Sequence, residues 1–202
     1  MTSIVSVVVL CHNRIYHLQQ SLNALLECRG VEDVKIIISA HDPSSEVLQL
    51  LSSMNFKDIE RNIISGITFS SVKQAINKNI YMGLKEAFAD SNCQLCIVLE
   101  DDILLSVDAL EFFKEIFSIH KNKKRFRAIN GFSKMLDGKD NEYVRLNYGV
   151  GWGWALLHSD STPHWSEMVA RGLKDRGAHL PLTQPSIQSS HQLHSLTRPH
   201  IH

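Results

Sequence analysis

The chain has 202 residues, and its 21 Lys and Arg balance 21 Asp and Glu, so the formal net charge is zero. This balance argues against a protein that coats nucleic acid or an anionic membrane, and no nucleic-acid partner is expected. No segment reaches the roughly 18 apolar residues needed to cross a bilayer. The apolar stretch 4–10 lacks the basic flank of a signal peptide. The lack of such signals predicts a cytoplasmic protein.

Strands and helices are expected to alternate along most of the chain. Continuous apolar runs predict buried strands at 4–10, 34–38 and 96–99, with a weaker candidate at 63–69. Helical apolar spacing predicts helices between them, whose inner faces carry Leu18, Leu22, Leu25 and Leu26; Val47, Leu48, Leu50 and Leu51; Val72, Ile76, Asn79, Gly83 and Ala87; and Leu110, Phe113, Ile116 and Phe117. Ser44 or Ser45 would cap the second helix, and Ser106 would open the last. The alternation predicts an α/β fold, with a parallel sheet flanked by helices.

Polar turns follow three of the expected strands. They are Asn13-Arg14, His41-Asp42 and the acidic run at 100–102. In parallel sheets, ligands bind beyond the carboxyl ends of the strands, so these turns are the expected site. Neither the glycine fingerprint of dinucleotide-binding proteins nor a Walker phosphate loop is present. A bound phosphate would therefore need another group to neutralise it.

Three consecutive carboxylates, Glu100, Asp101 and Asp102, follow the last of these strands. Their mutual repulsion is relieved by a divalent cation, and Mg²⁺ or Mn²⁺ takes carboxylate and phosphate oxygens together. In extended geometry Glu100 and Asp102 share one face and Asp101 points away. The alternative interpretation is a solvated acidic turn that caps the next helix. A Mg²⁺-dependent nucleotidyltransferase or phosphotransferase also fits the acids, but no Lys-bearing phosphate loop accompanies them.

Three motifs together carry a resemblance to a known family. The segments VVVLCHNR at 7–14, IIISAHD at 36–42 and IVLEDD at 97–102 resemble, in order and spacing, the nucleotide-sugar domain of GT-A glycosyltransferases. They are most similar to the N-acetylglucosaminyltransferase I-like family, over roughly residues 3–168. The resemblance implies a GT-A fold, which is a mixed, mostly parallel sheet. It also implies an inverting, metal-dependent transfer of N-acetylglucosamine from UDP-N-acetylglucosamine to a glycan or another hydroxyl acceptor.

The resemblance also assigns roles to individual residues. Asp102 would bind Mn²⁺, or Mg²⁺, at the diphosphate of the donor, while Glu100 and Asp101 would bind the ribose and the transferred sugar. Asp42 would accept a hydrogen bond from the uracil ring, and Arg14 would lie beside the nucleotide. The alternatives are that Arg14 is a surface residue and that Asp42 caps the helix after Pro43.

Two further parts of the donor site come from the resemblance. Asn79 stands where the family has a His near the uracil, which weakens the expectation of base recognition there. Gly151 and Trp152, in a Gly- and Trp-rich stretch at 147–155, would lie under the transferred sugar. The alternative for this stretch is a tight turn beside Trp side chains packed in the core.

The general base is the part of the expected enzyme that the sequence supports least. Asp160 and Glu167 are candidates, but the family pattern ends near residue 168. Segment 169–202, rich in His, Ser and Pro, is expected to be a disordered or aberrant tail. The GT-A-like domain at 1–168 would then lack its acceptor side, so a catalytically impaired nucleotide-sugar-binding remnant is the alternative function. If the chain is a fragment of a membrane-anchored enzyme, the alternative location is the Golgi lumen.

The pair Cys93 and Cys96 forms a single C-x-x-C motif. A structural zinc site would need a second pair, which Cys11 and Cys28 are too far apart to supply. We therefore interpret the motif as two thiols at the start of a buried strand.

Overall fold

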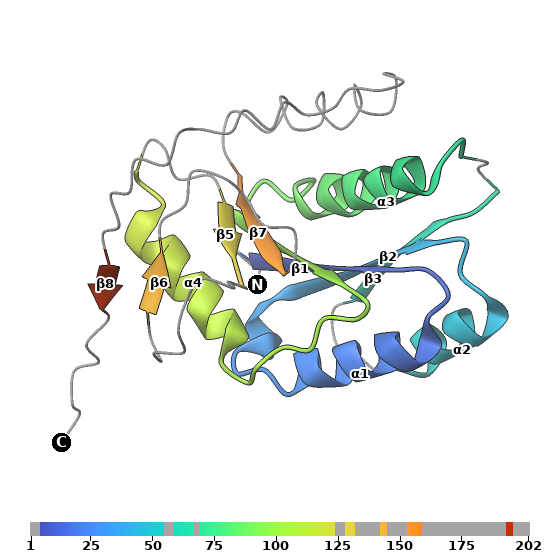
Figure 1. Cartoon of the computed structure of the whole chain (residues 1–202), viewed down its shortest axis with the longest axis horizontal. Coiled ribbons are helices and arrows are strands. Elements are labelled where there is room, and N and C mark those ends of the chain that lie inside the picture. The colour runs from blue at the N-terminus through green and yellow to red at the C-terminus, as the bar shows by residue number, and fades with distance from the viewer. Residues whose placement is uncertain are drawn as a thin grey trace.

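The computed structural model describes residues 5–54, 59–66, 69–123, 128–131, 142–144, 153–158 and 193–195. Its main element is a six-stranded sheet in the order β3-β2-β1-β4-β7-β5 (Figure 1). The strands are β1 (Val5–Cys11), β2 (Lys35–His41), β3 (Ile59–Ile64), β4 (Leu95–Glu100), β5 (Ala128–Asn130) and β7 (Trp154–Leu157). The first four are parallel, and β7 is antiparallel to both of its neighbours. The mixed, mostly parallel sheet expected of a GT-A fold is confirmed.

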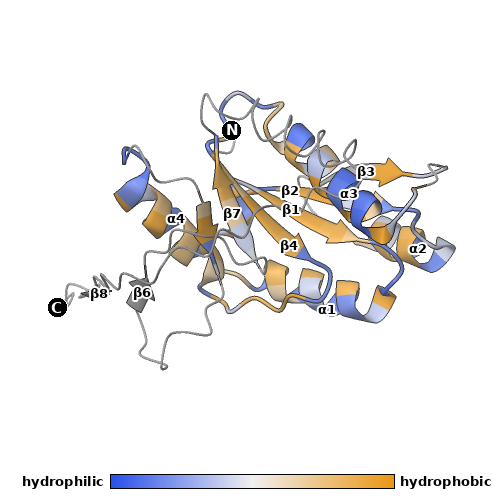
Figure 2. Ribbon diagram, turned by 45° about the horizontal axis from the view of Figure 1, so that its top comes forward, coloured by the Kyte–Doolittle hydropathy of each residue, from blue (hydrophilic) through white to orange (hydrophobic). Residues whose placement is uncertain are grey.

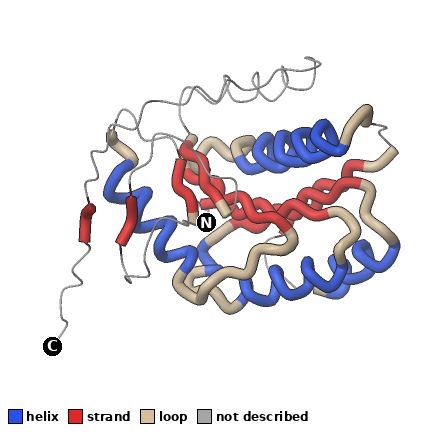
Figure 3. Tube along the Cα trace, in the orientation of Figure 1, coloured by secondary structure: helices blue, strands red, loops and turns tan. Residues whose placement is uncertain are grey.

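Helices cover both faces of this sheet. They are α1 (Ile15–Leu26), α2 (Ser45–Ser53), α3 (Val72–Ala87) and α4 (Ala109–His120), and a short 3₁₀ helix spans Val31–Asp33. Helices α1, α2 and α4 lie on one face and α3 on the other, so the sheet is the middle layer of three (Figure 3).

The core is divided by the sheet into two apolar layers. Along β1, Val7 and Val9 pack with the leucines of α1 and with α2 and α4, whereas Val8 and Leu10 pack toward α3. This alternation follows from the two-residue period of a strand. In Figure 2 the strands are almost wholly apolar between helices that are polar on their outer sides, as a sheet covered on both faces requires.

The structure corrects several details of the expected elements. Leu26 of α1 and Leu48 of α2, expected on the inner faces, are 43% and 40% exposed. The third strand spans Ile59–Ile64 instead of 63–69, because it is positioned by its pairing with β2. Helix α4 begins at Ala109, after a turn in which Ser106 Oγ donates to Asp108 Oδ1 at 2.7 Å. On α3, Asn79, Gly83 and Ala87 are buried as expected, but Val72 and Ile76 are 77% and 51% exposed.

A separate two-stranded antiparallel sheet joins β6 (Glu142–Val144) to β8 (Leu193–Ser195). Strand β8 falls inside the segment 169–202 that was expected to be a tail. The rest of that segment lies outside the described residues. Across the helices that the structure describes, none is both long and apolar enough to cross a bilayer.

Candidate functional site

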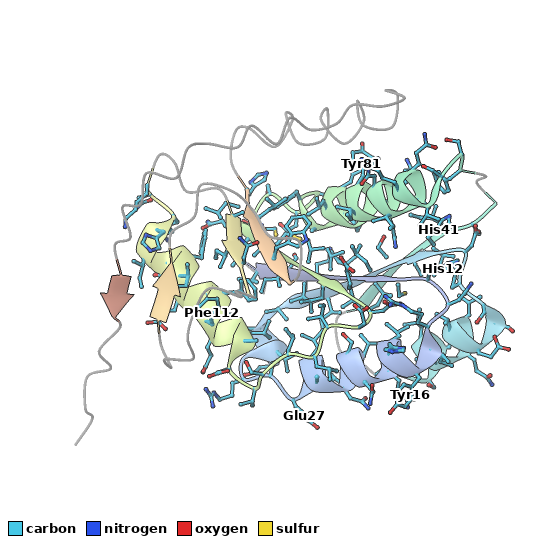
Figure 4. All side chains as sticks on the ribbon, viewed as in Figure 1. His12, Tyr16, Glu27, His41, Tyr81 and Phe112 are labelled. Carbon is cyan, nitrogen blue, oxygen red and sulfur yellow. The ribbon has the colours of Figure 1, made fainter. Side chains whose placement is uncertain are left out.

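The carboxyl ends of three neighbouring strands meet at one edge of the sheet. Strands β2, β1 and β4 are adjacent and parallel, and their register sets Cys11 opposite Ala40 and Leu10 opposite Glu100. The polar turns after these strands are therefore side by side, as the sequence predicted. Figure 4 shows His12 and His41 next to each other at this edge, with Tyr16 at the start of α1.

Arg14 links the first of these turns to the last. Its Nη1 donates to Asp102 Oδ2 at 2.8 Å, and its Nη2 donates to Asp101 Oδ1. The hydrogen bond to Asp101 is the main reason that the pKa of the guanidinium is raised, so Arg14 stays charged. Half of its side chain is exposed, so Arg14 is a surface residue that forms ion pairs with two acids, and its place beside a nucleotide stays a prediction.

The three acids differ in their surroundings. Glu100 is the last residue of β4, and the two aspartates form the turn that follows. The Asp101 side chain is only 4% exposed, whereas that of Asp102 is 38% exposed. Burial, and secondarily the charge of Asp102, raise the pKa of Glu100, and Arg14 opposes this shift. The strand ends at Glu100, and although Asp101 is buried and Asp102 is exposed, the Arg14 guanidinium binds both aspartates.

The donor set at this edge suits a divalent cation that takes most of its ligands from a substrate. Within the described residues, no three His, Cys, Asp or Glu side chains converge as a metal cluster. Asp102 nevertheless offers an accessible carboxylate that already holds a cationic group through Oδ2. Mg²⁺-type ions are commonly held by one or two carboxylates plus substrate phosphates, so the residues fit such an ion.

Asp42 directly follows β2 and is hydrogen-bonded to the end of β3 and to the residues after it. Its amide donates to the Ile64 carbonyl at 2.8 Å, and its Oδ1 accepts from the Gly66 amide at 3.2 Å. The residue has a φ of +40°, a left-handed conformation that Asp tolerates better than most residues. Ser44 caps α2 by accepting a hydrogen bond from the Val47 amide at 3.4 Å, which confirms one of the two expected serine caps; the alternative that Asp42 caps this helix is wrong.

A cluster of aromatic rings beside Asp42 was missed by the sequence analysis. The His12 and His41 rings stack with centroids 5.5 Å apart, and Phe69 meets His41 edge-on at 5.0 Å. His41 Nε2 lies 3.3 Å from Asp42 Oδ2. Their alignment is not that of a hydrogen bond, and this buried nitrogen has no hydrogen-bond partner in the described part of the chain. The available signal was that both histidines stand at the ends of adjacent strands.

Asn79 lies inside the protein, under the ends of β1 and β2. Its Oδ1 accepts from Ser39 Oγ at 2.6 Å, and its Nδ2 donates to the Cys11 carbonyl at 3.3 Å. The side chain is therefore bound to two strands of the sheet. Its contribution to donor binding stays a prediction.

The remaining site candidates, Gly151, Trp152, Asp160 and Glu167, lie outside the described residues, so their roles stay predictions. The structure does describe the residues directly after Trp152. Gly153 has a φ of +54°, and its carbonyl accepts from the Gly131 amide at 2.6 Å. Trp154 then begins β7.

The cysteine pair has the environment that the sequence predicted. Cys93 and Cys96 are free and buried, at the start of β4. Burial raises the pKa of both thiols, and it raises the pKa of Cys11 to about 12. These groups therefore belong to the core of the protein.

No family model matches this chain, and no curated protein matches its sequence. Among solved structures, S. aureus TarS is similar with a TM-score of 0.48 and 14% identity, over 58% of this chain and 20% of that one. TarS 1–349 in complex with UDP gives the same score over 32% of its own length. The mannosyltransferase PcManGT from Pyrobaculum calidifontis, in complex with GDP-Man and Mn²⁺, has a TM-score of 0.48 and 10% identity, over 64% of this chain and 35% of that one. The chain thus spans a third or less of TarS and about a third of PcManGT. Similarity at this level does not identify a function, which has to come from the residues of this chain.

Proposed function

We propose that this chain is the donor-binding part of a metal-dependent glycosyltransferase that uses a UDP-sugar, with UDP-N-acetylglucosamine as the donor. The observation that carries the proposal is the meeting of Arg14, Asp42 and Asp102 at the carboxyl edge of β1, β2 and β4. Together they supply a cation for a diphosphate, an acceptor for a ring N–H and a carboxylate for a divalent cation. The donor-binding domain would extend over 1–168, as the resemblance to N-acetylglucosaminyltransferase I suggests.

Each residue type suits the part of the donor that it would bind. The guanidinium of Arg14 has the planar fork that pairs with phosphate oxygens, and it can act where a glycine-rich phosphate loop is missing. Asp42 is held through Oδ1 by the Gly66 amide, and its Oδ2, which lies 3.3 Å from His41 Nε2, would accept a hydrogen bond from an imide N–H. Glu100 and Asp101 would bind ribose and sugar hydroxyls, for which carboxylate oxygens are good acceptors.

Bound Mn²⁺ or Mg²⁺ would supply charge stabilisation for the departing diphosphate. In the transfer, the bond between the anomeric carbon and the diphosphate oxygen breaks and UDP leaves with the bonding pair. The acceptor oxygen forms the new bond from the opposite face, which inverts the configuration. A general base takes the proton of the acceptor hydroxyl, and Asp160 and Glu167 are the candidates for this base. Arg14 would hold the leaving group in line.

The proposal is tested by calorimetry of UDP-N-acetylglucosamine with and without Mn²⁺, on the wild type and on Asp102→Asn. We expect Mn²⁺ to tighten donor binding to the wild type by about tenfold or more, and to leave Asp102→Asn almost unaffected. Asp33→Asn, at an exposed aspartate in the 3₁₀ helix, is the matched control and should behave as the wild type. A donor affinity that changes neither when Mn²⁺ is added nor when Asp102 is replaced would contradict the proposal.

UDP-glucose, UDP-galactose and GDP-mannose in the same assay test the choice of donor. Tighter binding of UDP-N-acetylglucosamine than of the others supports the proposed sugar and base. If the donor binds as expected but no sugar reaches an acceptor or water, the chain is a nucleotide-sugar-binding remnant without catalytic activity.

A further inference from the structure

Arg14 is hydrogen-bonded to the carboxylate of Asp102, the group that would bind the metal. Its Nη1 is 2.8 Å from Oδ2 of Asp102, while Nη2 holds Oδ1 of Asp101. One guanidinium thus neutralises two adjacent acids at the end of β4. A divalent cation at Asp102 would have to share, or take over, an oxygen that already accepts a charged hydrogen bond.

We propose that Arg14 is a built-in counter-ion that competes with the metal for Asp102 and is drawn away by the diphosphate, so that metal and nucleotide bind synergistically. This rests on the proposed function. With the metal alone, the incoming cation meets the positive charge of Arg14 at close range, which disfavours binding. With the diphosphate present, the guanidinium gains phosphate oxygens in exchange for Asp102, and the metal gains both the freed carboxylate and phosphate ligands.

The unequal burial of the two aspartates shows how Arg14 can change partners without leaving the site. Asp101 is almost fully buried, so its charge needs a permanent partner, and Arg14 is its ion-pair partner. Asp102 is 38% exposed and can exchange one cation for another. Arg14 itself is half exposed. It would therefore keep its bond to Asp101 while its other nitrogen turns from Asp102 to a phosphate oxygen.

The test is a titration of Mn²⁺, followed by the electron paramagnetic resonance signal of free Mn²⁺, with and without saturating UDP. It uses the wild type, Arg14→Gln and Arg29→Gln. Arg29 is a matched control, because its side chain is as exposed as that of Arg14 and it pairs with Glu111 away from this edge of the sheet. For the wild type and Arg29→Gln, we expect UDP to tighten Mn²⁺ binding by about tenfold or more.

For Arg14→Gln we expect Mn²⁺ alone to bind several-fold more tightly than to the wild type, and UDP to add much less. Arg14→Lys covers the case in which Arg14→Gln does not fold. A lysine has one charged centre and would stay with buried Asp101, so Mn²⁺ alone should again bind more tightly than to the wild type. Circular dichroism and thermal unfolding establish that each variant is folded. By linkage, Mn²⁺ must tighten UDP binding by the same factor as UDP tightens Mn²⁺ binding, which is an internal check.

The outcomes separate this inference from the function on which it rests. If UDP and Mn²⁺ bind together to the wild type but Mn²⁺ alone binds no more tightly to the folded Arg14 variants, the counter-ion role is overturned and the proposed function stands. If UDP fails to bind the wild type with or without Mn²⁺, both are overturned.

Discussion

The hydroxyl of Ser39 donates to the side-chain carbonyl of Asn79 at 2.6 Å, inside the protein and 40 positions away in sequence. Asn79 also donates to the Cys11 carbonyl at 3.3 Å. One amide on α3 therefore ties together the ends of β1 and β2, just before the turns that carry Arg14 and Asp42. A residue that the family resemblance connects with the uracil is, in this chain, also bonded within the fold.

We expect Asn79→Ala to lower the free energy of unfolding by about 1–3 kcal/mol, because it leaves the Cys11 carbonyl without this partner and opens a small void. Asn23→Ala, at an exposed position of α1, should change stability by less than about 0.5 kcal/mol. Urea unfolding of both variants measures the difference. Equal stabilities for the two variants would contradict the role of Asn79 as a link between strands.

Gly83 allows α3 to lie close to the sheet. A Cβ at this position would be 2.4 Å from Val8 Cγ1 and 3.3 Å from Ser39 Cβ. We expect Gly83→Ala to destabilise the protein by about 1–2 kcal/mol, because overpacking outweighs the better helix propensity of Ala. Lys85→Ala, at an exposed position of the same helix, is the control. Thermal unfolding distinguishes the two, and a Gly83→Ala variant more stable than the wild type would show that α3 is not held this close.

Glu100 gives the metal-free protein a pH-dependent stability. Because burial and the neighbouring aspartates raise the pKa of its folded form, its contribution is most favourable below the ordinary pKa of Glu and is lost as the pH rises through the raised pKa. We therefore expect Glu100→Gln to be more stable than the wild type at pH 7, with a melting temperature higher by about 1–3 °C. The difference should shrink towards pH 4.

Thermal unfolding of the wild type, Glu100→Gln and Glu115→Gln between pH 4 and 7 makes this measurement. Glu115 lies exposed on α4 and controls for the loss of a carboxyl group as such. A Glu100→Gln variant that is less stable than the wild type at pH 7 would mean that the ionised carboxylate is favoured in the folded protein.

The cysteines provide a test of the core that does not involve the site. All four are buried, and at pH 8 very little thiolate is present on Cys11, whose pKa burial raises to about 12. Since the thiolate is the reactive form, we expect an aromatic disulfide reagent to react slowly with the native protein and at once in denaturant. Ser52→Cys, on the exposed side of α2, is the positive control and should add one fast-reacting thiol. Rapid reaction that is lost in Cys93→Ser would instead indicate an accessible C-x-x-C pair.

Much of the fold could be predicted because apolar periodicity is a local property of the sequence. Leu18, Leu22 and Leu25 are fully buried on one face of α1, as their spacing indicates. The same rule failed at Val72 and Ile76, in the first turns of α3, because spacing identifies a face of a helix but not how far the sheet beneath it extends. Strand β3 was displaced for a similar reason, since its register depends on pairing with β2.

The candidate site also has features that the local sequence predicts and features that depend on how the strands pair. The position of the acids could be predicted, because a buried strand that ends in three carboxylates is visible in the sequence. The ion pairs between these acids and Arg14 could not be predicted. Arg14 is 88 positions from Asp102 in the sequence, and the two residues meet only because β1 and β4 are neighbours in the sheet. The stacking of His12 on His41 likewise depends on the pairing of β1 with β2.

The central claim is that Asp102 binds a divalent cation together with a nucleoside diphosphate. A crystal grown with UDP and Mn²⁺, and measured at the manganese absorption edge, tests it most directly. We predict an anomalous peak within coordinating distance of an Asp102 oxygen, with the diphosphate on the same ion and the Arg14 guanidinium against a phosphate oxygen. A nucleotide bound away from this edge of the sheet, or manganese that does not touch Asp102, would contradict the account.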